Sequence, residues 1–173
     1  MSLEEVRAKN IQLVSEKALD CFTKNGIANT KVADIAKAAG LTERSVYRYF
    51  EAKSDIVIAA AFCYWNRTKE HISRELSMHD YRDLSGIEQI SIILNSYANI
   101  LFIDPEGIRF SLDAEIALYS AGKNERVINR PPERFEEHSG PLSVAIEKGL
   151  KDGTVDPKAD IRQLYYNAYD SIL

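Results

Sequence analysis

Apolar residues recur at three- and four-residue spacing along almost the whole of this 173-residue chain. The first stripe, formed by Ile11, Val14, Ala18 and Phe22, is typical of one face of an amphipathic helix. No stretch of alternating β-branched residues predicts a strand, and the sequence holds neither an internal repeat nor a low-complexity segment. The pattern therefore predicts an all-α fold.

Turn and capping residues divide this pattern into separate helices. The first helix is expected to stop at Asn25-Gly26, because glycine accepts the left-handed conformation that ends many helices. Two short helices should follow, over 31–38 with Thr30 as its N-cap and over 43–50 with Thr42 as its N-cap. Longer helices are predicted over residues 54–78, 85–102, 105–120, 132–152 and 158–173, with Pro141 kinking or breaking the helix in which it falls.

Composition excludes several classes of protein. With 45% hydrophobic and 28% charged residues, the chain can bury a core and is not expected to be disordered. No window approaches 18 consecutive apolar residues, so no transmembrane helix is predicted, and the polar N-terminus lacks the apolar core of a signal peptide. Two cysteines, Cys21 and Cys63, are too few for a disulfide framework. These features predict a cytoplasmic protein.

Positive charge gathers near the N-terminus of a chain whose net charge is −4. Residues 24–53 contain six Lys or Arg against three Asp or Glu. The two predicted short helices that carry this charge are joined by Ala39-Gly40-Leu41, and the glycine permits a sharp turn between them. This geometry predicts a helical hairpin with a basic surface.

The second short helix has two distinct faces. Val46 and Phe50 are four residues apart and should point to the core, whereas the opposite face carries Arg44, Ser45, Tyr47 and Arg48. Such a helix suits the major groove of DNA, because arginine binds guanine O6 and N7 as a fork and hydroxyls reach bases or phosphates. From these residues alone, a solvated basic face without a DNA partner remains an equal alternative.

Phosphate contacts are predicted at both ends of this hairpin. Thr30 and Lys31 could hold a phosphate at the start of the first short helix, and Lys53 would lie beside the DNA backbone on the other side.

The same segment resembles the helix-turn-helix region of the tetracycline-repressor (TetR) family. The resemblance covers about 50 residues, from Ile11 to about Asp55, and lies in Ala18, Phe22, Gly26, Val32-Ala33-Asp34-Ile35-Ala36, Ala39-Gly40-Leu41-Thr42, Ser45-Val46-Tyr47-Arg48-Tyr49-Phe50 and Lys53. It implies a dimeric, all-helical, ligand-responsive transcriptional regulator whose third helix enters the major groove. A repressor released from a palindromic operator by a small molecule is the expected function.

The resemblance also assigns roles to single residues. Thr30 matches the family's phosphate-contacting cap, Tyr47 its aromatic contact in the third helix, Lys53 its backbone-clamping lysine and Thr42 the cap of the third helix. Two positions depart from the commonest pattern, since Arg44 stands where glycine is frequent and Tyr49 where histidine is frequent. Because Arg44 adds reach and charge, we expect the operator of this protein to differ in sequence from those that the commonest pattern recognises.

Residues 1–53 are accordingly predicted to form the helix-turn-helix domain, and residues 54–173 the domain that binds the ligand and forms the homodimer. Tyr64 and Trp65 are the first candidates for an apolar pocket, because in the resembled family this part of the fourth helix often faces the ligand. Helix phase adds Tyr97, Phe110, Asp113 and Tyr165. The dimer is expected to form through the last helices, around Leu164. Because the last helix is still periodic at Leu173, we expect the natural protein to continue beyond it.

Other chemistry finds little support in the sequence. The three histidines lack HExxH spacing, and no nucleophile-elbow, P-loop or dinucleotide-binding motif is present, so no metal, cofactor or catalytic residue is predicted. Two alternatives remain: a small helical enzyme that uses a carboxylate or histidine, and a DNA-binding architectural protein without a ligand. The expected partners are a double-stranded DNA operator, a small-molecule effector and a second copy of the chain, without a membrane.

Overall fold

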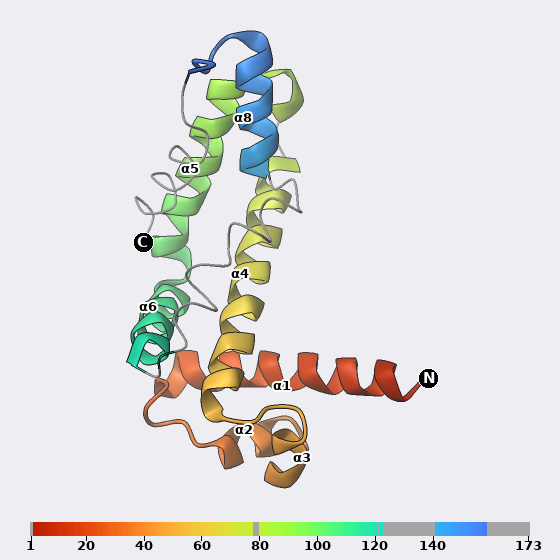
Figure 1. Ribbon diagram of the computed structural model, residues 1–173. Helices are drawn as coiled ribbons and strands as arrows, with labels where there is room; N and C mark the ends of the chain where they lie inside the picture. Colours follow the sequence, from red (N-terminus) through yellow and green to blue (C-terminus); the bar gives the residue numbers. More distant parts are fainter. Residues whose placement is uncertain (1, 78–79, 121, 123–140, 159–173) are drawn as a thin grey trace. The chain divides into compact units, whose positions relative to one another are not determined.

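The computed structural model describes residues 2–77, 80–120, 122 and 141–158, and all regular structure in these ranges is helical (Figure 1). The fold class predicted from the sequence is confirmed. The helices are α1 (Leu3–Asn25), α2 (Val32–Ala38), α3 (Glu43–Tyr47), α4 (Lys53–Ser77), the short 3-10 helix η1 (Tyr81–Asp83), α5 (Gly86–Ile103), α6 (Pro105–Ser120) and α8 (Pro141–Asp152).

Local capping chemistry explains where the first helices begin and end. Ser2 and Glu5 form a capping box at the start of α1, since each side chain accepts a hydrogen bond from the other residue's backbone N–H. The helix ends at Gly26, whose φ of +80° confirms the predicted stop. Thr42 is the N-cap of α3 as predicted, because its hydroxyl accepts a hydrogen bond from the backbone N–H of Ser45 at 3.2 Å.

The predicted cap of α2 is wrong. The N-cap is Lys31, whose backbone N–H donates to the carboxylate of Asp34 at 2.9 Å. Thr30 instead points inward, and its hydroxyl donates to the carbonyls of Gly26 (2.8 Å) and Cys21 (3.3 Å). These two hydrogen bonds hold Thr30 against the end of α1, in the turn between α1 and α2.

The end of α3 and the start of α4 also differ from the predictions. α3 ends at Tyr47 rather than near Phe50, and α4 already begins at Lys53. α8 begins at Pro141, which agrees with the predicted break there, and the first helical position suits proline because it needs no N–H donor. The predicted helix over 158–173, with Leu164, lies outside the described residues except for residue 158, and so do residues 132–140.

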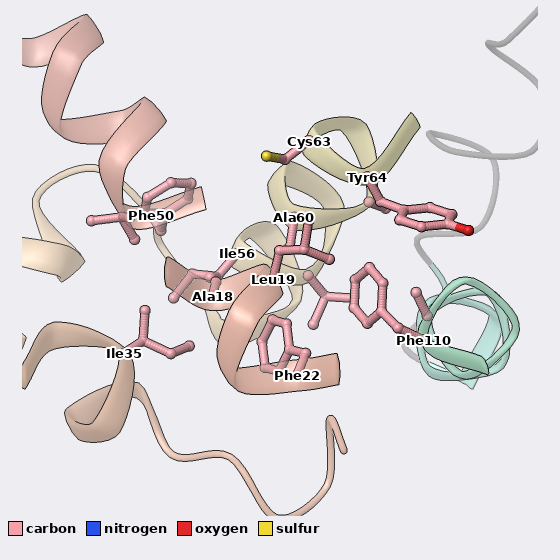
Figure 2. Packing of buried hydrophobic residues seen from close by; sticks show 14 of the residues in the cluster. Ala18, Leu19, Phe22, Ile35, Phe50, Ile56, Ala60, Cys63, Tyr64 and Phe110 are labelled. Atoms are coloured by element: carbon pink, nitrogen blue, oxygen red, sulfur yellow. The ribbon is translucent and has the colours of Figure 1, made fainter. Parts of the chain in front are cut away.

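The described residues fall into two compact units, one within 1–67 and 106–130 and the other within 68–105 and 131–173. In the first unit, α1, α2, α3, the first part of α4, and α6 share one hydrophobic core (Figure 2). Phe22 of α1 and Phe110 of α6 stack inside it, with ring centroids 5.8 Å apart. Helix α6 therefore packs with the predicted helix-turn-helix segment, whereas the functional division at residue 54 stays a prediction.

In the second unit, the start of α5 is bound to the end of α8. The backbone N–H of Gly86 donates to the Asp152 carboxylate at 2.7 Å, and that of Ile87 donates to the Thr154 hydroxyl at 3.1 Å. The two helices approach so closely that a Cβ atom on Gly86 would lie 2.1 Å from the backbone nitrogen of Gly149. Glycine is required at this crossing, because any larger residue would force the helices apart.

By length and composition α5 could cross a membrane, and it is the one helix in the described part of the chain of which this holds. The search for 18 consecutive apolar residues in the sequence had not identified α5 as a possible membrane-spanning helix. The helix packs against α8 with Gly86, Ile93 and Ile100 buried, while 28% of it in all is buried.

Candidate nucleic-acid interface

The turn between α2 and α3 sets the direction of α3. Gly40 has a φ of +67°, and the backbone N–H of Leu41 donates back to the carbonyl of Ala36 at 2.9 Å. After this turn, the side chain of Val46 on α3 lies in the core with none of its surface exposed. The side chain of Phe50, beyond the end of α3, is also buried, with 6% of its surface exposed. Both residues lie where the helical phase predicted them.

The opposite side of α3 presents three large polar side chains to solvent: Arg44, Tyr47 and Arg48. Tyr47 keeps 47% of its surface exposed. Ser45 is half-buried, and its hydroxyl shares a 2.8 Å hydrogen bond with the Thr42 hydroxyl and accepts one from the Arg48 guanidinium at 3.3 Å. Ser45 thus orients Arg48 and the cap, while the two arginines and the tyrosine form the exposed surface.

Lysines lie around this surface. Lys31 and Lys37 on α2 are exposed. Lys53, at the first turn of α4, is half-buried and donates its ammonium to the carbonyl of Ile27 at 2.5 Å. Of the predicted phosphate contacts, Thr30 has only 1% of its surface exposed. The side chains available to a phosphate on this surface are therefore lysines rather than Thr30.

A second set of contacts ties the end of α3 to α1. The amide of Asn10 donates to the Tyr49 hydroxyl at 2.9 Å, and the guanidinium of Arg7 lies over the Tyr49 ring, 5.7 Å from its centroid. Sequence reasoning noted Tyr49 as unusual but missed Arg7 and Asn10. No local pattern could have found them, because they meet Tyr49 only through the packing of α1 beside α3.

The predicted ligand residues are distributed over both units. Tyr64 and Phe110 lie in the core of the first unit, 3% and 2% exposed, with their rings edge to face at 6.4 Å. Trp65 is half-buried and meets the edge of Tyr64 at 6.0 Å. Asp113 is exposed on α6.

Two of the predicted ligand residues lie elsewhere. Tyr97 belongs to the second unit, where burial raises the pKa of its hydroxyl. Tyr165 lies outside the described residues. The structure therefore brings together Tyr64, Trp65 and Phe110 from the predicted set.

Neither cysteine has the features of a reactive thiol. The pKa of the Cys21 thiol and that of the Cys63 thiol are both raised, mainly by burial. The higher pKa lowers the fraction of thiolate at neutral pH. No group of three His, Cys, Asp or Glu side chains is placed to hold a metal ion within the part of the chain that the structure describes.

Comparison with known proteins connects this geometry to a family. The family model "Bacterial regulatory proteins, tetR family" matches residues 15–60, which contain the C-terminal part of α1, all of α2 and α3 and the start of α4. A probable HTH-type transcriptional regulator, ArpR of Pseudomonas putida, is 34% identical over 83 residues. That match covers 48% of this chain and 39% of ArpR.

A longer match reaches the rest of the chain. The fatty acid metabolism regulator protein of Bacillus subtilis is 33% identical over 160 residues, which cover 92% of this chain and 77% of that protein. The chain belongs to the TetR family. A crystal structure of the regulator FadR from Bacillus subtilis in complex with stearoyl-CoA matches with a TM-score of 0.57 and 17% identity, over 92% of this chain and 81% of that one. The all-helical TetR-family fold thus extends over both units.

Proposed function

We propose that the protein is a ligand-responsive, DNA-binding transcriptional regulator, a repressor that a small molecule releases from a palindromic operator. The observation that carries the proposal is the two-sided α3, with Val46 fully buried and Arg44, Tyr47 and Arg48 exposed on the other side. The relatives named above are regulators rather than enzymes by name. No catalytic role is proposed for any residue, and a cytoplasmic location is part of the proposal.

DNA binding would use α3 as the recognition helix. The major groove of B-DNA, about 12 Å wide, admits one α-helix with its side chains. Arg44 and Arg48 lie one turn apart and both can reach base edges, where an arginine fork recognises guanine. Lys31 at the start of α2 would face one phosphate strand and Lys53 the other, while Thr42 holds the start of α3.

Specificity requires two such helices, because one α3 contacts only a few base pairs. We propose a two-fold homodimer, so that two copies of α3 enter major grooves about 34 Å, or a multiple of that, apart on a near-palindromic operator. The dimer contact is assigned to the last helices around Leu164, which lies outside the described residues.

The effector class is proposed from the relative whose match reaches beyond the first half of the chain. The match to ArpR spans 83 residues, whereas that to the Bacillus subtilis fatty acid metabolism regulator spans 160. The crystal structure of FadR from Bacillus subtilis, which has a similar fold, is a complex with stearoyl-CoA. A long-chain fatty acyl thioester is therefore the first effector class to test, with Tyr64, Trp65, Phe110 and Asp113 of the first unit as candidate contacts.

A band-shift experiment tests both parts of the proposal. Duplexes selected from a random pool by the full chain should converge on a near-palindrome, and the same sequence should occur upstream of a gene in the source genome. Adding stearoyl-CoA should release the selected duplex, whereas free coenzyme A should not. A pool that fails to converge would overturn the proposed DNA-binding function, and release by neither compound would overturn the acyl-thioester effector.

A further inference from the structure

Tyr49 connects α1 to the end of the recognition helix. Its backbone N–H donates to the carbonyl of Val46 at 2.9 Å, so it continues the turn that closes α3. Its hydroxyl accepts from Asn10 at 2.9 Å, in a partly buried contact between residues 39 positions apart. The ring is thereby held at one position beside α1, and Figure 1 shows α3 below the middle of α1.

The guanidinium group of Arg7 lies over the face of the Tyr49 ring. Its guanidinium carbon lies 5.7 Å from the ring centroid, within the range of a cation–π contact. The side chain is exposed, and no ion pair joins it to a carboxylate in the described ranges. A cation–π contact uses the flat face of the guanidinium and none of its five N–H donors, so these donors remain able to bind an anion.

We propose that Arg7 contacts a DNA phosphate and so extends the DNA interface onto α1, with Tyr49 and Asn10 as its positioning residues. This inference rests on the proposed DNA-binding function. Tyr49 lies two residues beyond the end of α3, which places Arg7 beside the rim of a groove that α3 enters. The rims of the major groove are formed by phosphates, for which the arginine fork is well suited.

The ring contact determines how Arg7 would act. A free arginine on a helix surface samples many rotamers, and ordering it on DNA costs conformational entropy. Stacking on Tyr49 already restricts the side chain, and the Asn10 hydrogen bond restricts Tyr49 in turn. The contact should therefore strengthen binding to any duplex, because phosphates are the same in every sequence.

Salt-dependent binding of the full chain to its selected operator and to a random duplex tests the inference. Arg7→Ala should weaken both by the same factor and should lower the slope of log K against log salt by about one. The wild-type advantage over Arg7→Ala should then shrink about 3.5-fold between 50 and 200 mM salt. Unchanged affinity for both duplexes would overturn the inference.

Lys9→Ala is the matched control, because Lys9 is an exposed cation two residues away on α1, whereas the α1 residues that contact Tyr49 in the described ranges are Arg7 and Asn10. It should have a clearly smaller effect than Arg7→Ala. Equal losses for the two variants would mean that general charge attraction suffices and would overturn the inference. Thermal unfolding should leave Lys9→Ala at the wild-type midpoint and should lower that of Arg7→Ala only slightly, since both side chains are exposed and Arg7 loses only its contact with the Tyr49 ring.

Tyr49 variants test the positioning role. Tyr49→Leu removes the ring, so that adding Arg7→Ala in this background should cost less than in the wild type. Tyr49→Phe keeps the ring and should restore most of the Arg7 effect. The same cost of Arg7→Ala in all three backgrounds would overturn the role of Tyr49.

Failure of this inference can be told apart from failure of the proposed function. If the wild type binds no duplex, the proposed function fails as well. If the wild type binds and Arg7→Ala binds equally well, only this inference is overturned.

Discussion

The rings of Phe22 and Phe110 lie almost parallel, with 7° between their planes and 5.8 Å between their centroids. One belongs to α1 and the other to α6, and between the residues next to them in sequence the Arg109 guanidinium donates to the carbonyl of Thr23 at 3.3 Å. Helix α6 therefore packs directly against the C-terminal part of α1.

Truncation of this stacked pair should destabilise the first unit. Phe110→Ala is expected to cost about 3–5 kcal/mol in the free energy of unfolding, because a fully buried aromatic leaves a cavity between α1 and α6. Urea-induced unfolding followed by circular dichroism measures this loss. Tyr119→Ala is the control on the same helix, since Tyr119 is 71% exposed and should change the stability little. Similar costs for the two variants would contradict the assignment of Phe110 to the core.

Arg48 is expected to determine operator preference. Arg48→Ala should cost about 1–3 kcal/mol on the selected operator and less on random duplex, because a base contact is lost only where the right base is present. Lys53→Ala should weaken both duplexes about equally, since a phosphate contact carries no sequence information. Titrations at one fixed salt concentration make this comparison. Equal affinity of wild type and Arg48→Ala for the operator would rule out a base contact by Arg48.

Glu115 makes stability depend on pH in a direction that can be predicted. Burial disfavours its charged form and raises the pKa of the Glu115 carboxyl above the ordinary 4.5. The folded protein therefore binds the Glu115 proton more tightly than the unfolded chain does. The stability that this protonation contributes is lost as pH rises from about 4.5 through the raised pKa. Glu115→Gln should equal or exceed the wild-type stability at pH 7, and this relative gain should vanish below pH 4.5.

Unfolding midpoints measured from pH 4 to pH 8 test this sign. Asp113→Asn removes an exposed carboxylate from the same helix and shows the effect of charge alone. A Glu115→Gln variant that is less stable than the wild type at pH 7, while Asp113→Asn is not, would mean that the carboxylate makes a favourable contact when ionised.

Trp65 should report effector binding without a label, because it is the sole tryptophan of the chain and lies beside Tyr64. Titration with stearoyl-CoA should change its emission. Linkage requires that the ligand weaken DNA binding by the same factor as DNA weakens ligand binding, and a coupling of about 1–3 kcal/mol, or about 5–150-fold, is expected. Equal ligand affinity in the presence and absence of operator would show that the two sites are uncoupled.

Much of the local structure could be predicted because its causes are local. The stop at Gly26 and the cap at Thr42 depend on backbone conformation and hydrogen bonds within a few residues. The same holds for the two faces of α3, since helical phase alone separates Val46 from Arg44 and Arg48.

The sequence by itself thus determined the helical class, most helix boundaries, the family and the exposed surface of α3. Only the tertiary structure decided that Thr30 turns inward, that Arg7 and Asn10 meet Tyr49, and that Phe110 stacks on Phe22. The physical reason is that a helical pattern shows which side of a helix is apolar but not which other helix covers it. That choice follows from the packing of whole side-chain surfaces, which joins residues far apart in the chain.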